Sequence, residues 1–363
     1  MQLNQLTFTR FLAAISIVVF HYGMASPPFN FSIFSTLFSH ANIGVSYFFI
    51  LSGFVMVIAY SAKRVKINIK EYYVNRFARI YPVYFLALLI TALLIIVKLG
   101  EFDIIEFALS SSLIQGWFPQ YATSLNGPGW SLSVEMFFYV LFPFLFNLGY
   151  STKNLKSISI CVLAFWLISQ VVFNSLFYSP FYKGYPSFSH SFLHYFPAMH
   201  LSEFMIGNLT GLFFLRYRKN KNFDLSIVFL MILIPLTIIL TEHFKVKLNF
   251  HNGLMAYIFV PLILLLSMNT GRITTLFSHK FCILLGEISY GVYILQYPIF
   301  LVVRYFSKYI PHTHPSVVFY FYLLMLFGTS LLSYYLIELP ARKRIKSVME
   351  KKINKKKEIK AYA

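Results

Sequence analysis

The chain has 363 residues, of which 58% are hydrophobic and only 12% are charged. Soluble domains carry about a quarter charged residues, so this composition excludes an ordinary soluble enzyme. The net charge of +19 would suit nucleic-acid binding only with a folded basic domain, and the sequence shows none. Because a membrane span takes about 20 apolar residues, the repeated long apolar stretches predict an all-α polytopic membrane protein.

The apolar stretches predict ten transmembrane helices, separated by charged or Pro/Asn-rich segments such as RYRKNKN. In chain order they cover residues 11–29, 41–60, 80–98, 128–148, 158–178, 198–216, 224–241, 252–269, 285–306 and 316–337. No signal-peptide cleavage pattern precedes the first stretch, which we therefore expect to be a retained span. Residues 1–340 are predicted to form one transmembrane domain, and residues 341–363 a basic cytoplasmic tail.

The basic residues predict the orientation of these helices. With a cytoplasmic N-terminus, only 6 of the 31 Lys and Arg residues fall outside: Lys98, Lys183, Lys245, Lys247, Arg304 and Lys308. Cytoplasmic loops of membrane proteins carry the excess of Lys and Arg, so both termini are predicted to be cytoplasmic. The lysine-rich tail is expected to touch anionic lipid headgroups.

The first span carries two ionisable residues, Arg10 and His21. Eleven residues of α-helix make about three turns, so both side chains share one face and are about 16.5 Å apart along the axis. Arg10 then lies at the cytoplasmic interface, and His21 lies near or beyond the bilayer midplane. A snorkelling anchor and a packed imidazole explain the pair equally well at this point, but ionisable residues inside membranes are usually functional.

Arg76 and Arg79 follow in the segment NRFARIYP, at the predicted cytoplasmic start of the third span, with Pro82 in its first turns. Residues three apart are neighbours on a helix. Two guanidiniums at this level suit a phosphate-bearing ligand, because each can bind two oxygens. Spacing alone favours the simpler interpretation that both are positive-inside residues.

The segment GPGWSLSVEMFFYV predicts a turn and then a helix that carries Trp130, Ser131 and Glu135. Ser131 and Glu135 are four residues apart and share a face. Glu135 is predicted to lie in the outer half of the membrane, where a carboxylate needs a partner. An imidazole at similar depth, His21, is the expected one.

These motifs together resemble the acyltransferase-3 family of integral-membrane O-acyltransferases. The family pattern begins with an Arg, ten residues and a His, as in Arg10 and His21, and it recurs in order to near the end of the chain. The further matching residues are Gly44, Val45, Phe48, Phe49, Leu51, Ser52, Gly53 and Phe54, then Arg76, Arg79, Ile80 and Pro82, then Trp130, Ser131, Leu132 and Glu135, then Ser289, Tyr290 and Tyr293, and finally Glu338 and Pro340.

One residue departs from this pattern in a way that matters for chemistry. The late family motif ends in a histidine, whereas this chain has Gln296 in the segment SYGVYILQ. Glutamine forms hydrogen bonds but takes up no proton at neutral pH. Proton transfer would then rest on His21.

The resemblance implies a role for each of these residues. Arg10, Arg76 and Arg79 would bind the phosphates of cytoplasmic acyl-CoA, the co-substrate, expected to be acetyl-CoA. His21 would act as general base on the acceptor hydroxyl or form an acyl-histidine. Glu135 would orient His21 as in a catalytic triad, with Ser131 in the same catalytic group. Residues expected to contact the substrate are Trp130, Tyr290, Tyr293 and Gln296.

No metal and no permanently bound cofactor are expected. His190, His194, His200 and Glu203 could supply metal ligands, but Pro197 interrupts their helix and packing is the preferred interpretation. The predicted function is transfer of an acetyl or other short acyl group to a sugar hydroxyl of a cell-surface polysaccharide or its lipid-linked precursor, such as O-antigen or capsule, in the inner membrane. The alternative is a transporter or flippase of a lipid-linked glycan or small metabolite. We find no inverted repeat, which is typical of many transporters.

Overall fold

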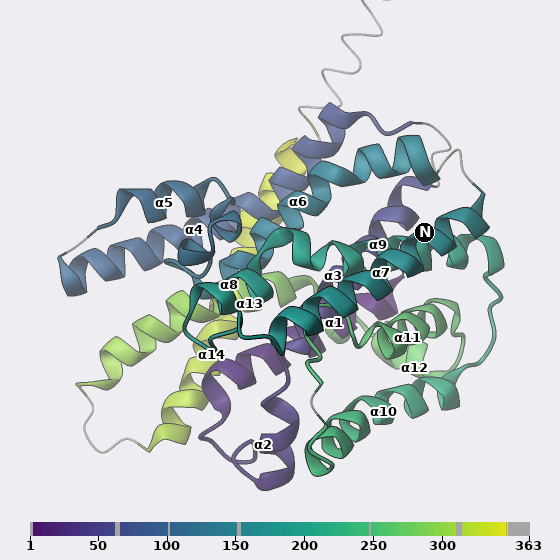
Figure 1. The fold of residues 1–363 in the computed structure, drawn as a ribbon. Coiled ribbons are helices and arrows are strands. Elements are labelled where there is room, and N and C mark those ends of the chain that lie inside the picture. The colour runs from purple at the N-terminus through teal and green to yellow at the C-terminus, as the bar shows by residue number, and fades with distance from the viewer. Residues whose placement is uncertain are drawn as a thin grey trace, which may run out of the picture.

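The computed structural model describes residues 3–61, 66–100, 102–150, 154–246, 248–309, 314–345 and 347 (Figure 1). Within these ranges the protein is helical and contains no β-strand, which confirms the all-α prediction. The predicted tail falls almost wholly outside them. The long helices are α1 (Asn4–Val18), α3 (Ile43–Ser61), α4 (Ile69–Leu99), α6 (Trp130–Phe144), α7 (Leu155–Phe177), α9 (Leu201–Tyr217), α10 (Asp224–His243), α11 (Ala256–Met268), α13 (Lys280–Ser307) and α14 (Pro315–Ser333).

Each of the ten predicted spans overlaps one of these helices. In the described part of the chain, eight segments are long and apolar enough to cross a membrane: Asn4–Gly23, Ile43–Ser61, Ile69–Lys98, Gly127–Tyr150, Leu155–Phe177, Asp224–His243, Lys280–Ser307 and Pro315–Ile345. The other two, α9 and α11, have only 17 and 13 residues. The protein is thus a multi-pass membrane protein, with eight long spans and two shorter helices packed among them.

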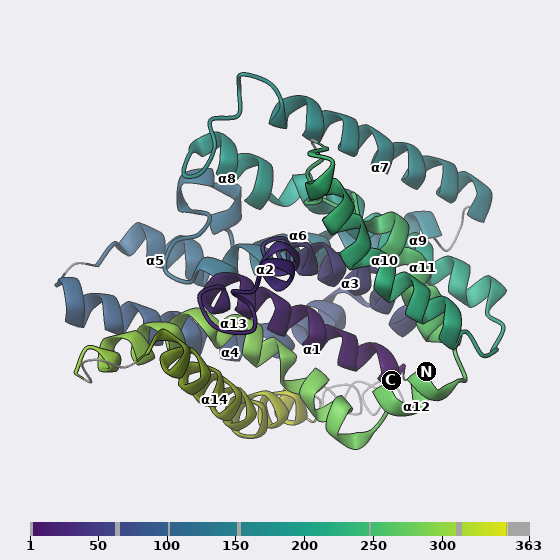
Figure 2. The same cartoon turned by 90° about the horizontal axis from the view of Figure 1, so that it is seen from below.

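Shorter helices join the long ones. They are α2 (Ser32–Phe38), α5 (Ile104–Ser111), α8 (Phe188–Tyr195) and α12 (Arg272–Phe277). Helix α7 lies along the edge of the bundle in Figure 2, and α10 lies along its lower edge in Figure 1, whereas α1, α3 and α13 lie near the middle in Figure 2. The middle helices are therefore the ones able to hold a protected site.

Helix α4 starts eleven residues earlier than predicted. The Asn68 side chain accepts a hydrogen bond from the Glu71 amide at 3.3 Å, which caps the first turn, and Gly100 ends the helix with a φ of 71°. Pro82 consequently lies well inside the helix rather than in its first turns. The sequence pattern missed this start because the first helical turns are polar, and only the later ones are apolar.

Helices α3 and α9 approach each other closely through small residues. A Cβ at Gly207 would collide with the carbonyl of Ile50, and one at Gly53 would collide with the carbonyl of Phe204. Gly207 and Gly211 form a GxxxG sequence in α9, the spacing that lets membrane helices pack backbone to backbone. This contact holds α9 in the centre of the bundle although it is short.

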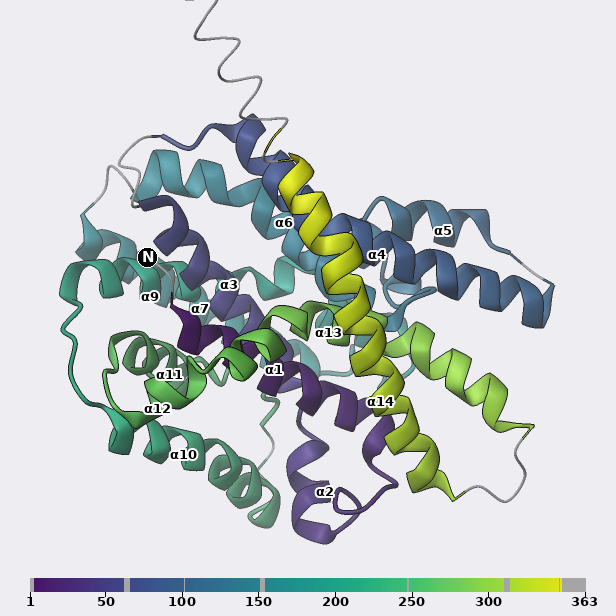
Figure 3. The same ribbon diagram turned by 180° about the vertical axis from the view of Figure 1, so that it is seen from behind.

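Helix α13 lies against α1 and α14 (Figure 3). A Cβ at Gly286 would collide with the Thr7 carbonyl, and further along both helices His21 contacts Gln296. The two helices therefore run in the same direction, and residues spaced along α1 face residues spaced along α13.

Residues 112–129, which connect α5 to α6, fold into the helical body instead of lying on its surface. Leu113, Gln115 and Asn126 are at most 3% exposed, and the Asn126 amide donates to the Ile294 carbonyl in the middle of α13 at 3.0 Å. Irregular backbone at membrane depth is tolerated only when protein surrounds it. Ile114 and Phe118 remain exposed, but the end of the segment is buried at Pro128 and Gly129, so α6 begins inside the bundle and its first turns face internal space.

Candidate functional site

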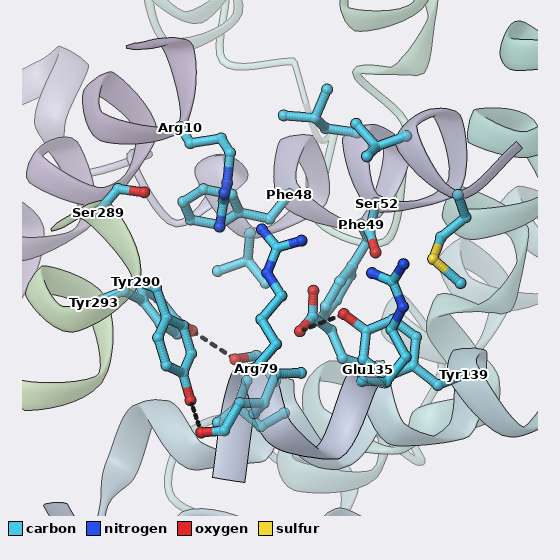
Figure 4. Close-up of a pocket in the computed structure, with 18 residues that line it drawn as sticks. Arg10, Phe48, Phe49, Ser52, Arg79, Glu135, Tyr139, Ser289, Tyr290 and Tyr293 are labelled. Carbon is cyan, nitrogen blue, oxygen red and sulfur yellow. Dashed lines mark hydrogen bonds between the residues drawn. The ribbon is translucent and has the colours of Figure 1, made fainter. Parts of the chain in front are cut away.

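An internal cavity of about 110 Å³ lies where α1, α3, α4, α6 and α13 meet, and we call it the arginine cavity (Figure 4). Polar and charged side chains from all five helices line it: Arg10, Ser52, Arg76, Arg79, Ser131, Glu135, Tyr139, Ser289, Tyr290 and Tyr293. Apolar residues, among them Phe48 and Phe49, complete the wall. Seven of the ten sequence-predicted site residues therefore share one cavity, although they come from four separate motifs.

The three arginines differ in how the protein holds them. The Arg76 guanidinium lies 5.6, 5.8 and 5.7 Å from the ring centres of Tyr60, Tyr72 and Tyr139, and its Nη2 donates to the Tyr60 hydroxyl at 3.4 Å. Three rings around a cation fix its position. No residue spacing in the sequence predicts such a cage around Arg76, because the three rings come from three different helices.

Arg10 and Arg79 have no comparable protein partner. Figure 4 shows both side chains pointing into the arginine cavity. No hydrogen bond or salt bridge to another described residue involves either guanidinium. Each guanidinium carries five N–H donors, so these two side chains present donors and positive charge to whatever enters the cavity.

Glu135 lies in the arginine cavity and accepts a hydrogen bond from Tyr139, four residues later in α6, at 3.4 Å. The predicted pairing of Glu135 with His21 is wrong, because no hydrogen bond joins them and His21 does not line the cavity. The physical reason is depth. Since α6 begins inside the bundle, Glu135 lies at the level of Arg10. His21 lies eleven residues further along the first helix, at a different depth.

Ser131, Tyr290 and Tyr293 use their hydroxyls to fasten helices together. Tyr293 donates to Ser131 Oγ at 2.9 Å, and Ser131 donates in turn to the Pro128 carbonyl at 2.9 Å. Tyr290 donates to the Ile80 carbonyl at 2.6 Å. Ser131 is thus hydrogen-bonded on both sides with no base beside it, so the geometry favours a structural role over the predicted catalytic one.

His21 and Gln296 form a second polar site, beyond the arginine cavity. His21 Nδ1 lies 2.9 Å from Gln296 Oε1, and Gln296 follows Tyr293, a cavity residue, by one turn of α13. His21 lies in a π-helical turn, Val19–Gly23, which continues α1. Such single π-turns are rare in proteins as a whole, but those that occur are often found at functional sites.

Trp130 lies in neither site. Its ring is 7% exposed and packs 5.0 Å from Tyr195 and 5.3 Å from His200, measured between ring centres. Stacking on a substrate stays a prediction for Trp130, and one that this packing disfavours.

Beside Trp130 lie His190, His194, His200 and His251 with Glu203, which we call the histidine cluster. Adjacent imidazole centres are 4.2 Å apart for His190 and His194, and 5.0 Å for His194 and His251. Burial and the neighbouring histidines lower the pKa of His194 to about 3 and that of His251 well below its usual value. In the described ranges, no group of three or more His, Cys, Asp or Glu side chains could hold a metal ion.

The innermost pair of the histidine cluster, His200 and Glu203, must share a proton between the two side chains. His200 Nε2 faces the His194 carbonyl at 2.9 Å, so this nitrogen donates. His200 Nδ1 faces Glu203 Oε2 at 2.7 Å, and both side chains are at most 1% exposed. A hydrogen bond there needs a proton on one partner or the other. The pair is therefore neutral as a unit.

Comparison with known proteins agrees with these motifs. A family model described as an acyltransferase domain matches residues 3–338, nearly the whole chain. The chain belongs to the acyltransferase-3 family. It is also 31% identical over 163 residues to Acyltransferase MdmB of Streptomyces mycarofaciens. That alignment covers 40% of each chain, so the similarity spans about two fifths of the relative's length. No solved structure matches.

One polar residue of the candidate site, Tyr139, escaped the sequence analysis. Tyr139 could have been found from its spacing of four residues from Glu135. The closing family motif contains Glu338, and the fold explains its role. Glu338 is 2% exposed and forms a salt bridge with Arg342 at 3.2 Å. Arg342 also lies 3.5 Å from Glu287 on α13. This pairing ties the end of α14 to α13.

Proposed function

We propose that the protein transfers an acetyl or other short acyl group from cytoplasmic acyl-CoA to a sugar hydroxyl. The acceptor is a cell-surface polysaccharide or its lipid-linked precursor, and the enzyme works in the inner membrane. Residues 1–340 form the transmembrane transferase, with the basic tail on the cytoplasmic side.

One observation carries the proposal: three guanidiniums line the arginine cavity with a single carboxylate, Glu135. Removing charges from water costs free energy unless opposite charges or hydrogen bonds compensate them. Glu135 attracts both Arg10 and Arg79, and Glu338 attracts them as well. Neither guanidinium forms a hydrogen bond or salt bridge with a described residue, and one carboxylate in the cavity does not balance three guanidiniums. The excess positive charge supports an anionic ligand, and phosphate oxygens suit the planar, forked guanidinium. Acyl-CoA carries phosphates at its nucleotide end.

The separation of the two sites supports a long, thin donor. Arg10 and His21 are eleven residues apart on α1 and its π-turn, a rise of about 16 Å. The pantetheine arm of CoA is an extended chain that separates the phosphates from the thioester by a similar length. With the phosphates at Arg10 and Arg79, the thioester would lie near His21.

The chemistry at His21 follows from this placement. The imidazole takes the proton of the acceptor hydroxyl while the hydroxyl oxygen attacks the thioester carbonyl carbon. The carbon–sulfur bond then breaks, and the proton passes from His21 to the departing CoA thiolate. An acyl-histidine, formed and then attacked by the hydroxyl, is the second mechanism for the same residues.

Purified protein in proteoliposomes, with radiolabelled acetyl-CoA outside and glycan acceptor present, tests the proposal. Label on the glycan is the expected result, and excess unlabelled CoA should compete. Glycan movement across the bilayer without label would instead indicate a transporter. Release of free acetate without glycan labelling would show that the acceptor has been assigned wrongly.

A further inference from the structure

The amide of Gln296 has only one possible orientation. Gln296 is fully buried, and its Nε2 donates to the Tyr293 carbonyl at 2.6 Å. A carbonyl oxygen accepts hydrogen bonds and never donates them, so the opposite orientation would place two acceptors against each other. The Oε1 atom must therefore face His21.

This orientation determines which nitrogen of His21 carries the proton. Gln296 Oε1 lies 2.9 Å from His21 Nδ1 and can only accept. Nδ1 must then donate, and in neutral imidazole this leaves the lone pair on Nε2. No described residue forms a hydrogen bond with Nε2, so this atom is free to take a proton.

We infer that Gln296 is a positioning residue, which holds His21 in the tautomer whose Nε2 serves as the base. This inference rests on the proposed acyl transfer. It replaces the expectation that Gln296 contacts the substrate, because both ends of its amide are bonded within the protein. The arrangement resembles a triad in which an acceptor group fixes the tautomer of the base, but here the acceptor is neutral.

The neutral acceptor has a consequence for the proton. In the transfer step the acceptor hydroxyl loses its proton to Nε2, the new carbon–oxygen bond forms and the carbon–sulfur bond breaks. His21 then carries protons on both nitrogens without a carboxylate beside it, since Glu135 lies in the arginine cavity. The imidazolium therefore passes its proton directly to the departing thiolate.

The π-helical turn makes this contact possible. His21 lies in the middle of the segment Val19–Gly23, at the point where α1 faces α13. A Cβ at Gly23 would press on the Phe319 ring of α14 at 2.7 Å, so the turn is packed tightly on its far side as well. The backbone thus holds His21 toward Gln296.

The test compares Gln296→Leu with wild type in proteoliposomes, using two readouts. Transfer from acetyl-CoA should fall about 10- to 100-fold in kcat, the effect of one lost buried hydrogen bond on the base, with KM for acetyl-CoA changed less than about twofold. Gln296→His should restore most of the rate, because an imidazole can also donate to the Tyr293 carbonyl and accept from His21. Gln170→Leu is the matched control, because Gln170 is another buried glutamine that donates to a backbone carbonyl, that of Asn252.

The second readout is independent of activity. Solid-state NMR of the protein with ¹⁵N-labelled histidine, with the His21 signals assigned by difference from His21→Asn, reports the tautomer directly. Wild type should show Nδ1 protonated and Nε2 free, and Gln296→Leu should lose that preference. A wild-type His21 with the proton on Nε2 would overturn the inference, and so would an unchanged kcat in a folded Gln296→Leu enzyme. Absence of acyl transfer in wild type would instead contradict the proposed function, whatever the tautomer.

Discussion

The arginine cavity and the histidine cluster are both dense groups of ionisable side chains inside the same bundle, yet they are built in opposite ways. In the histidine cluster, most of the buried groups bond to one another: His200 is bonded at both nitrogens, to the His194 carbonyl and to Glu203 Oε2, and only Glu203 Oε1 of this pair has no hydrogen-bond partner among the described residues. In the arginine cavity, Arg10 and Arg79 face open space without a bonded partner among the described residues.

This difference separates structural polar groups from a ligand site. A buried network that is complete stabilises one conformation, whereas charges left without partners favour the fold only if a ligand or solvent completes them. Sequence analysis singled out residues of both groups. The number of hydrogen bonds that their side chains form within the protein now distinguishes them. Substitutions in the cavity or at His21 should change activity, and substitutions in the cluster should change stability.

The largest effect is expected for His21→Ala, which removes the proposed base. Loss of a general base lowers rates about 10²- to 10⁴-fold. The measurement is acetyl transfer per folded enzyme, with protein folding checked by size-exclusion chromatography in detergent. His243→Ala, an exposed histidine at the end of α10, is the control and should keep full activity. Normal transfer by a well-folded His21→Ala enzyme would remove His21 from the mechanism.

Arg79→Ala should raise the KM for acyl-CoA about 10- to 100-fold, because hydrogen bonds to a charged group contribute about 1.5–3 kcal/mol. The KM for the acceptor should change little. Lysine at this position should restore binding only in part, since it lacks the forked guanidinium. Arg216→Ala removes an exposed cation at the end of α9 and serves as the control.

Arg76 and Arg79 line the same cavity but should differ in how much each contributes to stability. Its guanidinium is enclosed by Tyr60, Tyr72 and Tyr139, so Arg76→Ala should lower the thermal midpoint as well as raise the KM for acyl-CoA. An unchanged response to acyl-CoA in both Arg76→Ala and Arg79→Ala would show that these residues serve only membrane orientation.

In the histidine cluster, Glu203→Leu should destabilise the protein by about 1–3 kcal/mol, because it leaves the buried His200 Nδ1 without a partner. Glu203→Gln should recover part of this loss, since the amide can donate to that nitrogen. The measurement is the thermal midpoint in detergent together with activity per folded molecule. Reduced activity with unchanged stability would place the cluster in the catalytic site and erase the distinction drawn above.

The smallest effect concerns pH. Burial lowers the pKa of His194 to about 3, below the value of about 6.5 expected in the unfolded chain. The unfolded state therefore binds more protons than the folded state at pH values between these two. His194 costs no stability above pH 6.5, and its cost grows as the pH falls toward 3. Acidification from pH 7.5 to 5.5 should cost about 1 kcal/mol from this residue.

Comparison of the pH dependence of unfolding in wild type, His194→Asn and the exposed control His243→Asn tests this expectation. The wild type and the control should lose stability in parallel, and the His194→Asn protein should lose less. Equal slopes in all three would mean that His194 takes up a proton in the fold as readily as in the unfolded chain.

The sequence predicted the presence and order of the long helices far better than the residues at which they begin and end. Long apolar runs determine membrane helices almost by themselves, because backbone groups in a bilayer must be satisfied within the helix, and each of the ten predicted spans overlaps one. The start of α4 at Ile69 was missed since its polar first turns carry no apolar signal. The π-turn at His21 was also missed, because no residue pattern distinguishes it from α-helix.

The sequence by itself determined the chemistry available to this protein. Arg10, His21, Arg76, Arg79 and Glu135 are ionisable residues in apolar surroundings, and their order along the chain matches one family. Such residues are conspicuous in sequence because burying them in a membrane is costly.

Only the tertiary structure decided which of these residues meet. The end of the segment 112–129 is anchored inside the bundle through Asn126, and α6 therefore starts there and brings Glu135 to the arginines instead of to His21. The π-turn and the parallel packing of α1 on α13 give His21 a glutamine for a partner. Depth and phase depend on contacts between distant segments, which residue spacing along one helix cannot contain.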